Sequence, residues 1–315
     1  MPAAPKRLQL HPPTQTRVTS LGDAGAQWVA NLPDVLSDLA ARWSITIGDP
    51  LQVGSASYVA VATTTDGQEV VVKVALSRDG LDDQVRTIEA ARGRGYVLLL
   101  AHDLHRHALL MERLGPSMDH DPMPPEAQIN ALVATLRLAW ETPPSAGMTV
   151  RPGDDKASQL HQLIRDLWER LGHPCPERVV AQALAFAERR AAAFDLDACV
   201  VVHGDPHPGN ALRVIRPRAG AESCFCFVDP DGFLCDRAYD LGVVLRDWNE
   251  HLRGEDARAV AERYCQQLAR LSGVEEQCIW EWGYTERVST GLYAMSFGAF
   301  AFGQGLLESA GRLLD

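Results

Sequence analysis

The sequence predicts an α+β fold, with a β-rich N-terminal lobe and a largely helical C-terminal lobe. At 315 residues the chain is long enough to build two cores. The first third of the chain contains several short runs of apolar, β-branched residues, which are typical of strands. Beyond residue 127, most apolar side chains recur at the spacing of a helix. No long linker separates the two regions, so we place the boundary at Leu114-Gly115 and expect domains at 1–114 and 115–315.

The first lobe should be a short helical region followed by antiparallel strands. Residues 23–42 carry apolar side chains at helical spacing, broken by Pro33, which predicts one or two helices. The Asp66-Gly67 pair predicts a tight turn between two of the strands. The histidines of HDLHRH fall in a second hairpin, where a solvated turn explains them better than a metal site. The predicted strands are 51–54, 58–64, 69–76, 96–101 and 108–113.

The second lobe alternates helical periodicity with proline breaks and two short apolar strands. The apolar stretch 291–307 contains glycines and is too short for a membrane span, so we expect a buried C-terminal helix. The predicted strands are 199–202 and 224–228. The predicted helices are 127–141, 159–171, 178–194, 239–252, 257–272 and 275–290.

The most informative stretches are VVVHGDPHPGN and CFCFVDPDG, because each ends a strand with polar side chains. They present Asp205, Asn210 and Asp229 at neighbouring strand ends. Phosphoryl transfer needs oxygen ligands for Mg²⁺ and a group that aligns the attacking hydroxyl. We interpret Asp205 as the catalytic base or orienting residue, and Asn210 and Asp229 as metal ligands. A zinc site of His203, Asp205 and His207 lacks another ligand at a characteristic spacing.

HGDPHPGN has the HGDxxxxN pattern of aminoglycoside phosphotransferases, which resembles the catalytic loop of protein kinases. Together with LGDAGAQWVANL, ALLMERL and DRAYDLG, it resembles the streptomycin 6-kinases of the aminoglycoside/hydroxyurea phosphotransferase family over most of the chain. The resemblance implies a bilobal protein-kinase-like fold, ATP and Mg²⁺ as cofactors, and Asp240 as a structural brace of the catalytic loop.

The nucleotide-binding residues are expected in the first lobe. Lys73 lies within the apolar run VVVKV, where a charge is costly without an anionic partner, so we assign it to the ATP phosphates. Either Gln84 or Glu89 could face Lys73 from the following helix. Ser55 and Ser57 belong to a loop of small residues that suits phosphates, although a hairpin turn would explain them equally well. Backbone groups of Glu112 and Leu114 are expected to bind adenine.

The formal net charge of −11 favours a cationic small-molecule acceptor over nucleic acid or an anionic membrane. Carboxylates could pair amino or guanidino groups, and indoles could stack on sugars. The alternatives are a metabolite kinase for an amino sugar, a hydroxyurea kinase, or a nucleotide-binding regulator without activity. The acceptor-binding candidates are Asp231, Asp236, Trp248, Glu250 and Glu281, with Trp280 and Trp282 beside them.

The location of the protein is suggested by its N-terminus and its cysteines. MPAAPKRLQLHPP has no long apolar core, so we expect no secretory peptide. Seven scattered cysteines favour reduced thiols over a disulfide framework. The sequence therefore predicts a cytoplasmic protein.

Overall fold

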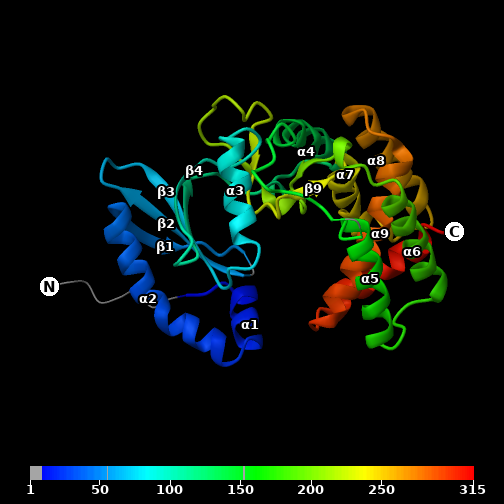
Figure 1. The fold of residues 1–315 in the computed structure, drawn as a ribbon, viewed down its shortest axis with the longest axis horizontal. Helices are drawn as coiled ribbons and strands as arrows, with labels where there is room; N and C mark the ends of the chain where they lie inside the picture. The colour runs from blue at the N-terminus through cyan, green and yellow to red at the C-terminus, as the bar shows by residue number, and fades with distance from the viewer. Residues whose placement is uncertain (1–8, 55, 152) are drawn as a thin grey trace. The chain divides into compact units, whose positions relative to one another are not determined.

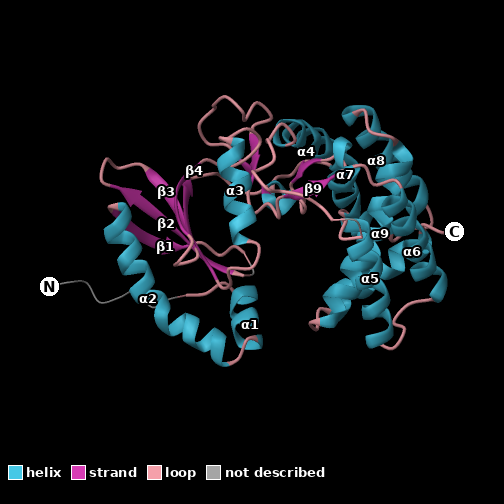
Figure 2. Cartoon of the chain, in the orientation of Figure 1, coloured by secondary structure: helices cyan, strands magenta, loops and turns pink. Residues whose placement is uncertain are grey.

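The computed structural model describes residues 9–54, 56–151 and 153–315. The chain divides into two compact units. The N-terminal unit contains the described residues up to Gly93 together with Val97–Gly115, and the C-terminal unit contains Arg94–Tyr96 and Pro116–Asp315. Strands concentrate in the first unit and helices in the second (Figure 2), which confirms the predicted α+β class.

The N-terminal unit is built on a five-stranded antiparallel sheet in the order β1-β2-β3-β5-β4 (Figure 1). The prediction of a strand at 51–54 was wrong. The first strand is Ile45–Pro50, whose Ile45 and Ile47 pair with Thr64 and Ala62. The strand ends in Gly-Asp-Pro, which interrupts the alternation of apolar and polar side chains expected of a strand. Its pairing with β2 also shifts register between Ile47 and Pro50. The strands are β1 Ile45–Pro50, β2 Ser57–Thr64, β3 Glu69–Ala75, β4 Leu99–Asp103 and β5 Ala108–Glu112.

One long helix, α2 (Asp23–Trp43), covers one face of this sheet. Pro33 lies inside the continuous helix and does not split it. Because side chains alternate across a strand, every second residue of β3 meets this helix. The shared core contains Leu32, Leu36 and Leu39 of α2 and Val70, Val72 and Val74 of β3.

Two further helices complete the N-terminal unit. Helix α1 (Pro12–Ser20) was not predicted, because it buries only Thr14 and Val18 and therefore shows little periodicity. The Thr14 hydroxyl donates to the backbone oxygens of Gly54 and Ser57, which ties α1 to the start of β2. Helix α3 (Leu81–Ala91) buries Leu81, Val85 and Ile88.

The C-terminal unit holds its polar loops on two small antiparallel ribbons. Strand β6 pairs with β9, and β7 pairs with β8. Strands β6 and β8 confirm the predictions at 199–202 and 224–228, whereas their three-residue partners were too short to predict. The strands are β6 Val200–Val202, β7 Ala211–Arg213, β8 Phe225–Phe227 and β9 Phe233–Cys235.

Helix α9 is the centre of the helical part, and α5, α6, α7, α8 and α10 all contact it. The apolar stretch 291–307 is two helices, not one: α9 ends at Ser296, and Gly298, at φ 95°, lets the chain turn into α10. The helices are α4 Pro125–Ala139, α5 Lys156–Arg170, α6 Glu177–Ala192, α7 Arg237–Arg246, α8 Ala257–Ser272, α9 Glu276–Ser296 and α10 Phe300–Arg312.

Helix α7 ends six residues earlier than the predicted 252, because Asp247 is extended and Trp248 adopts φ 54°. None of the helices in the described ranges is long and apolar enough to cross a membrane.

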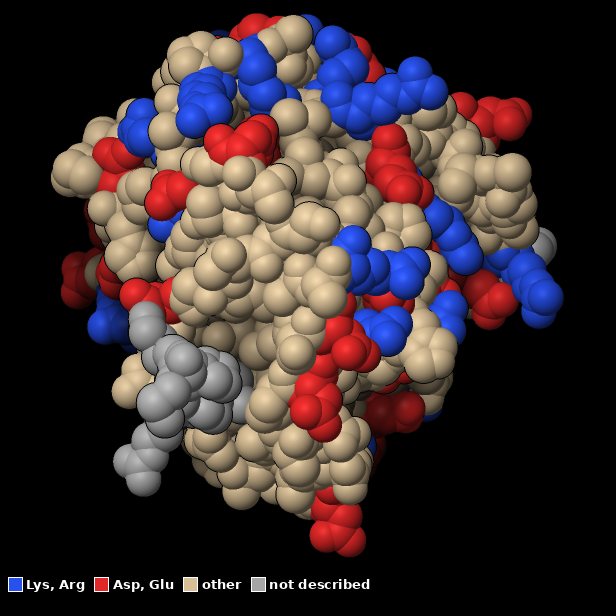
Figure 3. Space-filling model, turned by 90° about the vertical axis from the view of Figure 1, so that its left-hand side faces the viewer, with Lys and Arg blue, Asp and Glu red and all other residues tan. Residues whose placement is uncertain are grey.

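The surface in Figure 3 carries charges of both signs. Lys and Arg side chains lie beside Asp and Glu side chains around a largely uncharged centre. On this face the described residues form no continuous basic surface of the kind that binds a phosphate backbone.

Candidate active site

The loop that follows β6 is fixed by one buried carboxylate. Asp240 of α7 is fully buried, and its Oδ2 accepts from the backbone N–H of His203 at 2.9 Å and the indole N–H of Trp140 at 2.8 Å. Its Oδ1 accepts from the backbone N–H of Gly204 at 2.9 Å. Burial raises the pKa of Asp240 to about 6 despite these donors. The predicted bracing role of Asp240 is therefore confirmed by its contacts.

His203 locks the same loop to β8. The backbone N–H of Asp205 donates to Nδ1 of His203, so the proton lies on Nε2, which donates to the Val228 carbonyl at 3.0 Å. Burial lowers the pKa of His203 to about 4, so the ring is neutral at physiological pH. Both ring nitrogens are engaged, which leaves none for the zinc site considered from sequence.

Gly204 permits a close backbone approach within this loop. It has φ 93°, and a Cβ there would lie 2.6 Å from the Cβ of Asp231. The backbone N–H of Asp231 donates to the His203 carbonyl at 2.8 Å. A side chain at residue 204 would therefore push apart the segments that carry Asp205 and Asp231.

Asp205 lies between two basic side chains, Arg246 and His207, whose contacts with it were not predicted from the sequence. Nη2 of Arg246, at the end of α7, donates to Oδ1 of Asp205 at 2.7 Å, and Nε2 of His207 lies 3.5 Å from Oδ2. Burial pushes the pKa of Asp205 up, but Arg246 and His207 together outweigh it and hold the pKa below its usual value. The side chain remains 40% exposed, so an acceptor can reach an ionised carboxylate.

Arg246 is itself held by α9. Its Nη1 donates to the Thr290 hydroxyl at 3.1 Å and lies 3.4 Å from Oε2 of Glu286. The Tyr239 hydroxyl donates to Oε1 of the same Glu286 at 2.6 Å. The only sequence signal for this network was an arginine ending the otherwise apolar run LGVVLR.

Asn210 and Asp229 are brought together by the ribbon of β7 and β8. Asn210 precedes β7, Asp229 follows β8, and the backbone N–H of Val228 donates to the Asn210 carbonyl at 2.9 Å. Nδ2 of Asn210 donates to the backbone oxygen of Asp205, which fixes the amide so that Oδ1 remains as an oxygen ligand. An amide oxygen and a carboxylate fit Mg²⁺, which prefers hard oxygen donors. Across the residues that are placed, no group of three or more His, Cys, Asp or Glu side chains could hold a metal ion.

A hollow of about 840 Å³ opens beside Asp205 within the C-terminal unit. Three predicted acceptor-binding residues line it: Asp231, Trp248 and Glu250. Trp248 is largely buried, and its indole N–H donates to Gln128 at 2.9 Å, so only part of the ring is available to a ligand. The structure thus brings three of the five predicted residues to the same place as the catalytic loop.

Lys156, at the start of α5, was missed as a member of this hollow. Its Nζ lies 4.9 Å from the ring centroid of Phe233 and 5.4 Å from that of Tyr239. Asp231 is exposed at the surface of the hollow. The protein atoms around its carboxyl group nevertheless reduce its solvation, which raises the pKa of Asp231 to about 6. The charge of Lys156 opposes this shift and that of Asp205 adds to it. The hollow therefore carries mixed charges with a carboxylate excess.

The other two predicted acceptor residues lie outside the hollow. Asp236 caps the N-terminus of α7, where it accepts from the backbone N–H of Ala238 and the indole N–H of Trp282. Glu281 is buried between α9 and α6, with Oε1 2.8 Å from Nε of Arg189 and Oε2 2.6 Å from Nε of Arg190. These structural partners give the geometry no support for acceptor binding by Asp236 or Glu281. Neither Trp280 nor Trp282 lines the hollow.

In the N-terminal unit, Lys73 lies on the face of β3 opposite α2 and is 9% exposed. Its Nζ donates to Oε1 of Gln84 on α3 at 3.5 Å, whereas Glu89 pairs with His102 at 3.0 Å. Of the two residues considered from sequence, Gln84 is therefore the one facing Lys73. The side chain of α3 that faces Lys73 is thus a neutral amide.

The remaining nucleotide-binding candidates lie at ends of this sheet. Ser57 begins β2 and is buried, and Ser55 lies outside the described residues. Glu112 ends β5, where its Oε1 accepts from the backbone N–H of Leu98 at 2.8 Å. Leu114 is 3% exposed. Binding of adenine by the backbone of Glu112 and Leu114 stays a prediction.

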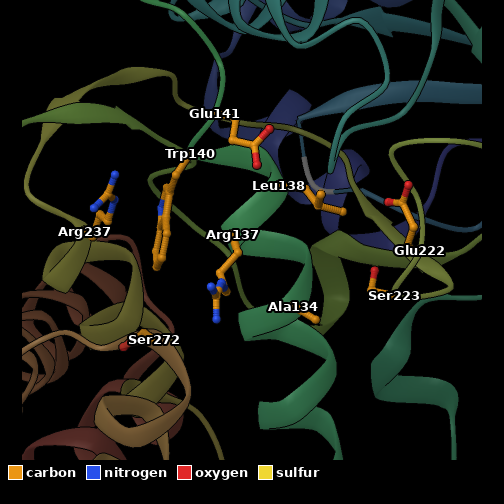
Figure 4. A pocket seen from close by; sticks show the side chains of 9 residues that line it. All are labelled: Ala134, Arg137, Leu138, Trp140, Glu141, Glu222, Ser223, Arg237 and Ser272. Atoms are coloured by element: carbon orange, nitrogen blue, oxygen red, sulfur yellow. The ribbon is translucent and has the colours of Figure 1, made fainter.

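A second hollow, of about 640 Å³, lies on the C-terminal unit and contains none of the predicted site residues (Figure 4). Trp140 stands there between Arg137 and Arg237, and the Arg237 guanidinium lies 5.9 Å from the indole centroid. Arg137 donates to the Leu271 carbonyl at the end of α8. These side chains support the helix packing behind Trp140, which in turn holds Asp240.

Comparison with known proteins adds to this geometry. The sequence model of the aminoglycoside/hydroxyurea antibiotic resistance kinases matches residues 42–298. The chain belongs to this family. A streptomycin 6-kinase from Streptomyces glaucescens is 26% identical over 285 residues, which cover 90% of this chain and 89% of the relative. A hydroxyurea phosphotransferase from Kitasatospora aureofaciens is 26% identical over 226 residues, covering 71% and 64%.

Solved structures agree on the fold. A choline kinase from Streptococcus pneumoniae matches with a TM-score of 0.59 at 13% identity, covering 90% of this chain and 99% of that one. At this identity the match shows the fold alone. Membership of the aminoglycoside/hydroxyurea antibiotic resistance kinases therefore confirms the predicted protein-kinase-like fold and small-molecule kinase activity.

Proposed function

We propose that this resistance-family kinase transfers the γ-phosphoryl group of ATP to a hydroxyl of a streptomycin-like aminoglycoside. The observation that carries the proposal is the ionised Asp205 in one hollow with Asp231 and Glu250. Such a site can orient a hydroxyl while its other carboxylates bind amino or guanidino groups. The named activity of the streptomycin 6-kinase relative supports the same acceptor class.

Each catalytic-loop residue has a defined task in this proposal. Asp205 accepts the hydrogen bond of the acceptor hydroxyl and aligns its oxygen for attack. Arg246 keeps Asp205 ionised, and His203 with Asp240 holds the loop in place. Asn210 Oδ1 and the Asp229 carboxylate would hold Mg²⁺, which neutralises phosphate charge when bound.

In the N-terminal unit we assign Lys73 to the nucleotide phosphates. It projects from the stretch 70–75 of β3, which is otherwise apolar, and its ammonium group donates to the amide oxygen of Gln84. Ser55 and Ser57 are proposed for the phosphates, and the backbone of Glu112 and Leu114 for adenine.

The test is product formation from ATP, Mg²⁺ and a panel of acceptors: streptomycin, kanamycin, glucosamine and hydroxyurea. We expect one phosphate on streptomycin by mass spectrometry, with the modified hydroxyl located by NMR. Transfer to glucosamine or hydroxyurea without transfer to streptomycin would replace the proposed acceptor. Tight binding of ATP without transfer to any acceptor would indicate a nucleotide-binding regulator.

A further inference from the structure

A cluster of exposed aromatic side chains lies where α9 turns into α10. Tyr293, Phe297, Phe300 and Phe302 are 48%, 58%, 59% and 60% exposed, and we call them the aromatic rim. The rings of Tyr293 and Phe297 pack edge to face with centroids 5.2 Å apart. Clustered exposed rings of this kind mark binding surfaces in soluble proteins.

The rim is continuous with the hollow that contains Asp205. Tyr293 and Phe302 line this hollow, together with Leu160, Leu163 and Leu306. These residues come from α5, α9 and α10. The charged lining comes from the catalytic loop, the segment after β8, the end of α7 and the turn that follows it, and also from Lys156 of α5 and Glu286 of α9. The hollow thus combines charged side chains around the reacting carboxylate with apolar side chains that include Tyr293 and Phe302 of the rim.

The rim is held in place by tight helix packing. Gly291 of α9 and Gly303 of α10 touch so closely that a Cβ on Gly303 would lie 2.4 Å from the Gly291 oxygen. Leu306 and Leu307 are buried beyond this contact. The backbone N–H of Gly298 donates to the Met295 carbonyl at 3.1 Å, which closes the turn. Because this packing fixes the backbone that carries the rim, less conformational entropy is lost when a ligand binds to it.

We propose that the aromatic rim is a subsite for an apolar part of the acceptor, so that the enzyme favours amphiphilic amino sugars. The inference rests on the proposed function, because it assumes that the acceptor hydroxyl lies at Asp205. The cationic end then lies among Asp231, Glu250 and Asp205. A ring face or alkyl group attached to the sugar then lies along Phe302 and Tyr293, the two rim residues that line the hollow.

Isothermal titration with two probes tests the proposal without requiring turnover. The probes are glucosamine and phenyl β-glucosaminide, titrated into the full chain with Mg²⁺ and a non-hydrolysable ATP analogue. Wild type should bind the phenyl derivative about tenfold more tightly, as expected for withdrawing part of one ring face from water. Phe302→Ala should abolish this preference, and Tyr293→Ala should weaken it.

The matched control is Ile215→Ala, which removes a side chain that is 55% exposed on the same unit but outside the hollow. It should keep the full preference. Equal binding of both probes by wild type, or an unchanged preference in Phe302→Ala, would overturn the subsite. Sedimentation equilibrium tests whether the rim instead binds a second copy of this chain. A dimer of wild type that becomes monomeric in Phe302→Ala would show that it does and would overturn the subsite. Streptomycin turnover, measured separately, decides the proposed function whatever the titrations show.

Discussion

Replacing Asp240 by Asn should separate the stability of the fold from the geometry of the catalytic loop. The pKa of Asp240 rises from 3.8 to about 6, so keeping it ionised at pH 7 costs about 3 kcal/mol of folding free energy. An amide removes this cost. However, its NH₂ group must face at least one of the N–H donors from Trp140, His203 and Gly204, which costs about 1–3 kcal/mol.

These opposing effects nearly cancel, so the free energy of unfolding of Asp240→Asn should stay within about 2 kcal/mol of wild type. The kcat for streptomycin should fall about 10²-fold, because a loop moved by 1 Å misplaces Asp205. Asp240→Ala removes the same ionisation cost but leaves all three buried donors unpaired, at about 1–3 kcal/mol each, so it should be less stable than Asp240→Asn. Urea unfolding and steady-state kinetics check both variants.

The pH dependence of stability gives this prediction a second readout. The folded-state pKa of Asp240 is raised, so its contribution to stability is fully present below about pH 4 and is lost as pH rises through about 6. Asp240→Asn does not undergo this loss. Its free energy of unfolding relative to that of wild type should therefore increase by about 3 kcal/mol between pH 4 and 7. Asp231 and Asp247 also have pKa values raised to about 6. Because wild type and Asp240→Asn both contain these residues, their contributions cancel in the difference between the two free energies of unfolding. A pH-independent difference, or normal kcat in folded Asp240→Asn, would show that an ionised Asp240 does not brace the catalytic loop.

Two further predictions concern the acceptor site. Arg246→Met removes the main charge that lowers the pKa of Asp205, so the acid limb of kcat/KM should move to higher pH, whereas Arg246→Lys should move it less. An unmoved limb in Arg246→Met would show that Asp205 does not titrate in catalysis. Asp231 loses its charge as pH falls through about 6, so KM for a cationic acceptor should rise below pH 6 in wild type but not in Asp231→Asn, whose KM is already high at pH 8. The same pH dependence in both proteins would assign the effect to another group.

The sequence predicted the elements whose pattern is local. Regular apolar spacing over α8 gave its bounds of Ala257–Ser272 without error. The strand β1 was misplaced because only Ile45 and Ile47 carry its alternation, and its pairing with β2 is a long-range contact. The turn at Gly298 was missed because hydrophobicity alone does not distinguish one buried helix from two packed ones.

The site was predictable where a motif fixed the spacing. Asp205, Asn210 and Asp229 gather because two strand ends meet, which their order in the chain indicates. Arg246 was not predictable in this way, since its contact with Asp205 depends on where α7 ends. The positions of Asp236 and Glu281 were misjudged for a related reason: closeness in sequence to the catalytic strands does not show which side of a helix faces the hollow.

We assign phosphoryl transfer to an acceptor hydroxyl to Asp205 and Asp229. The most direct test of this assignment is single-turnover transfer from radiolabelled ATP to streptomycin by wild type, Asp205→Asn and Asp229→Asn, with folding verified by circular dichroism. The transfer rate should be lower than that of wild type by at least about 10³-fold in both variants. ATP affinity should be retained in Asp205→Asn, because that residue serves the acceptor. Near-normal transfer by a correctly folded Asp205→Asn or Asp229→Asn protein would contradict the account.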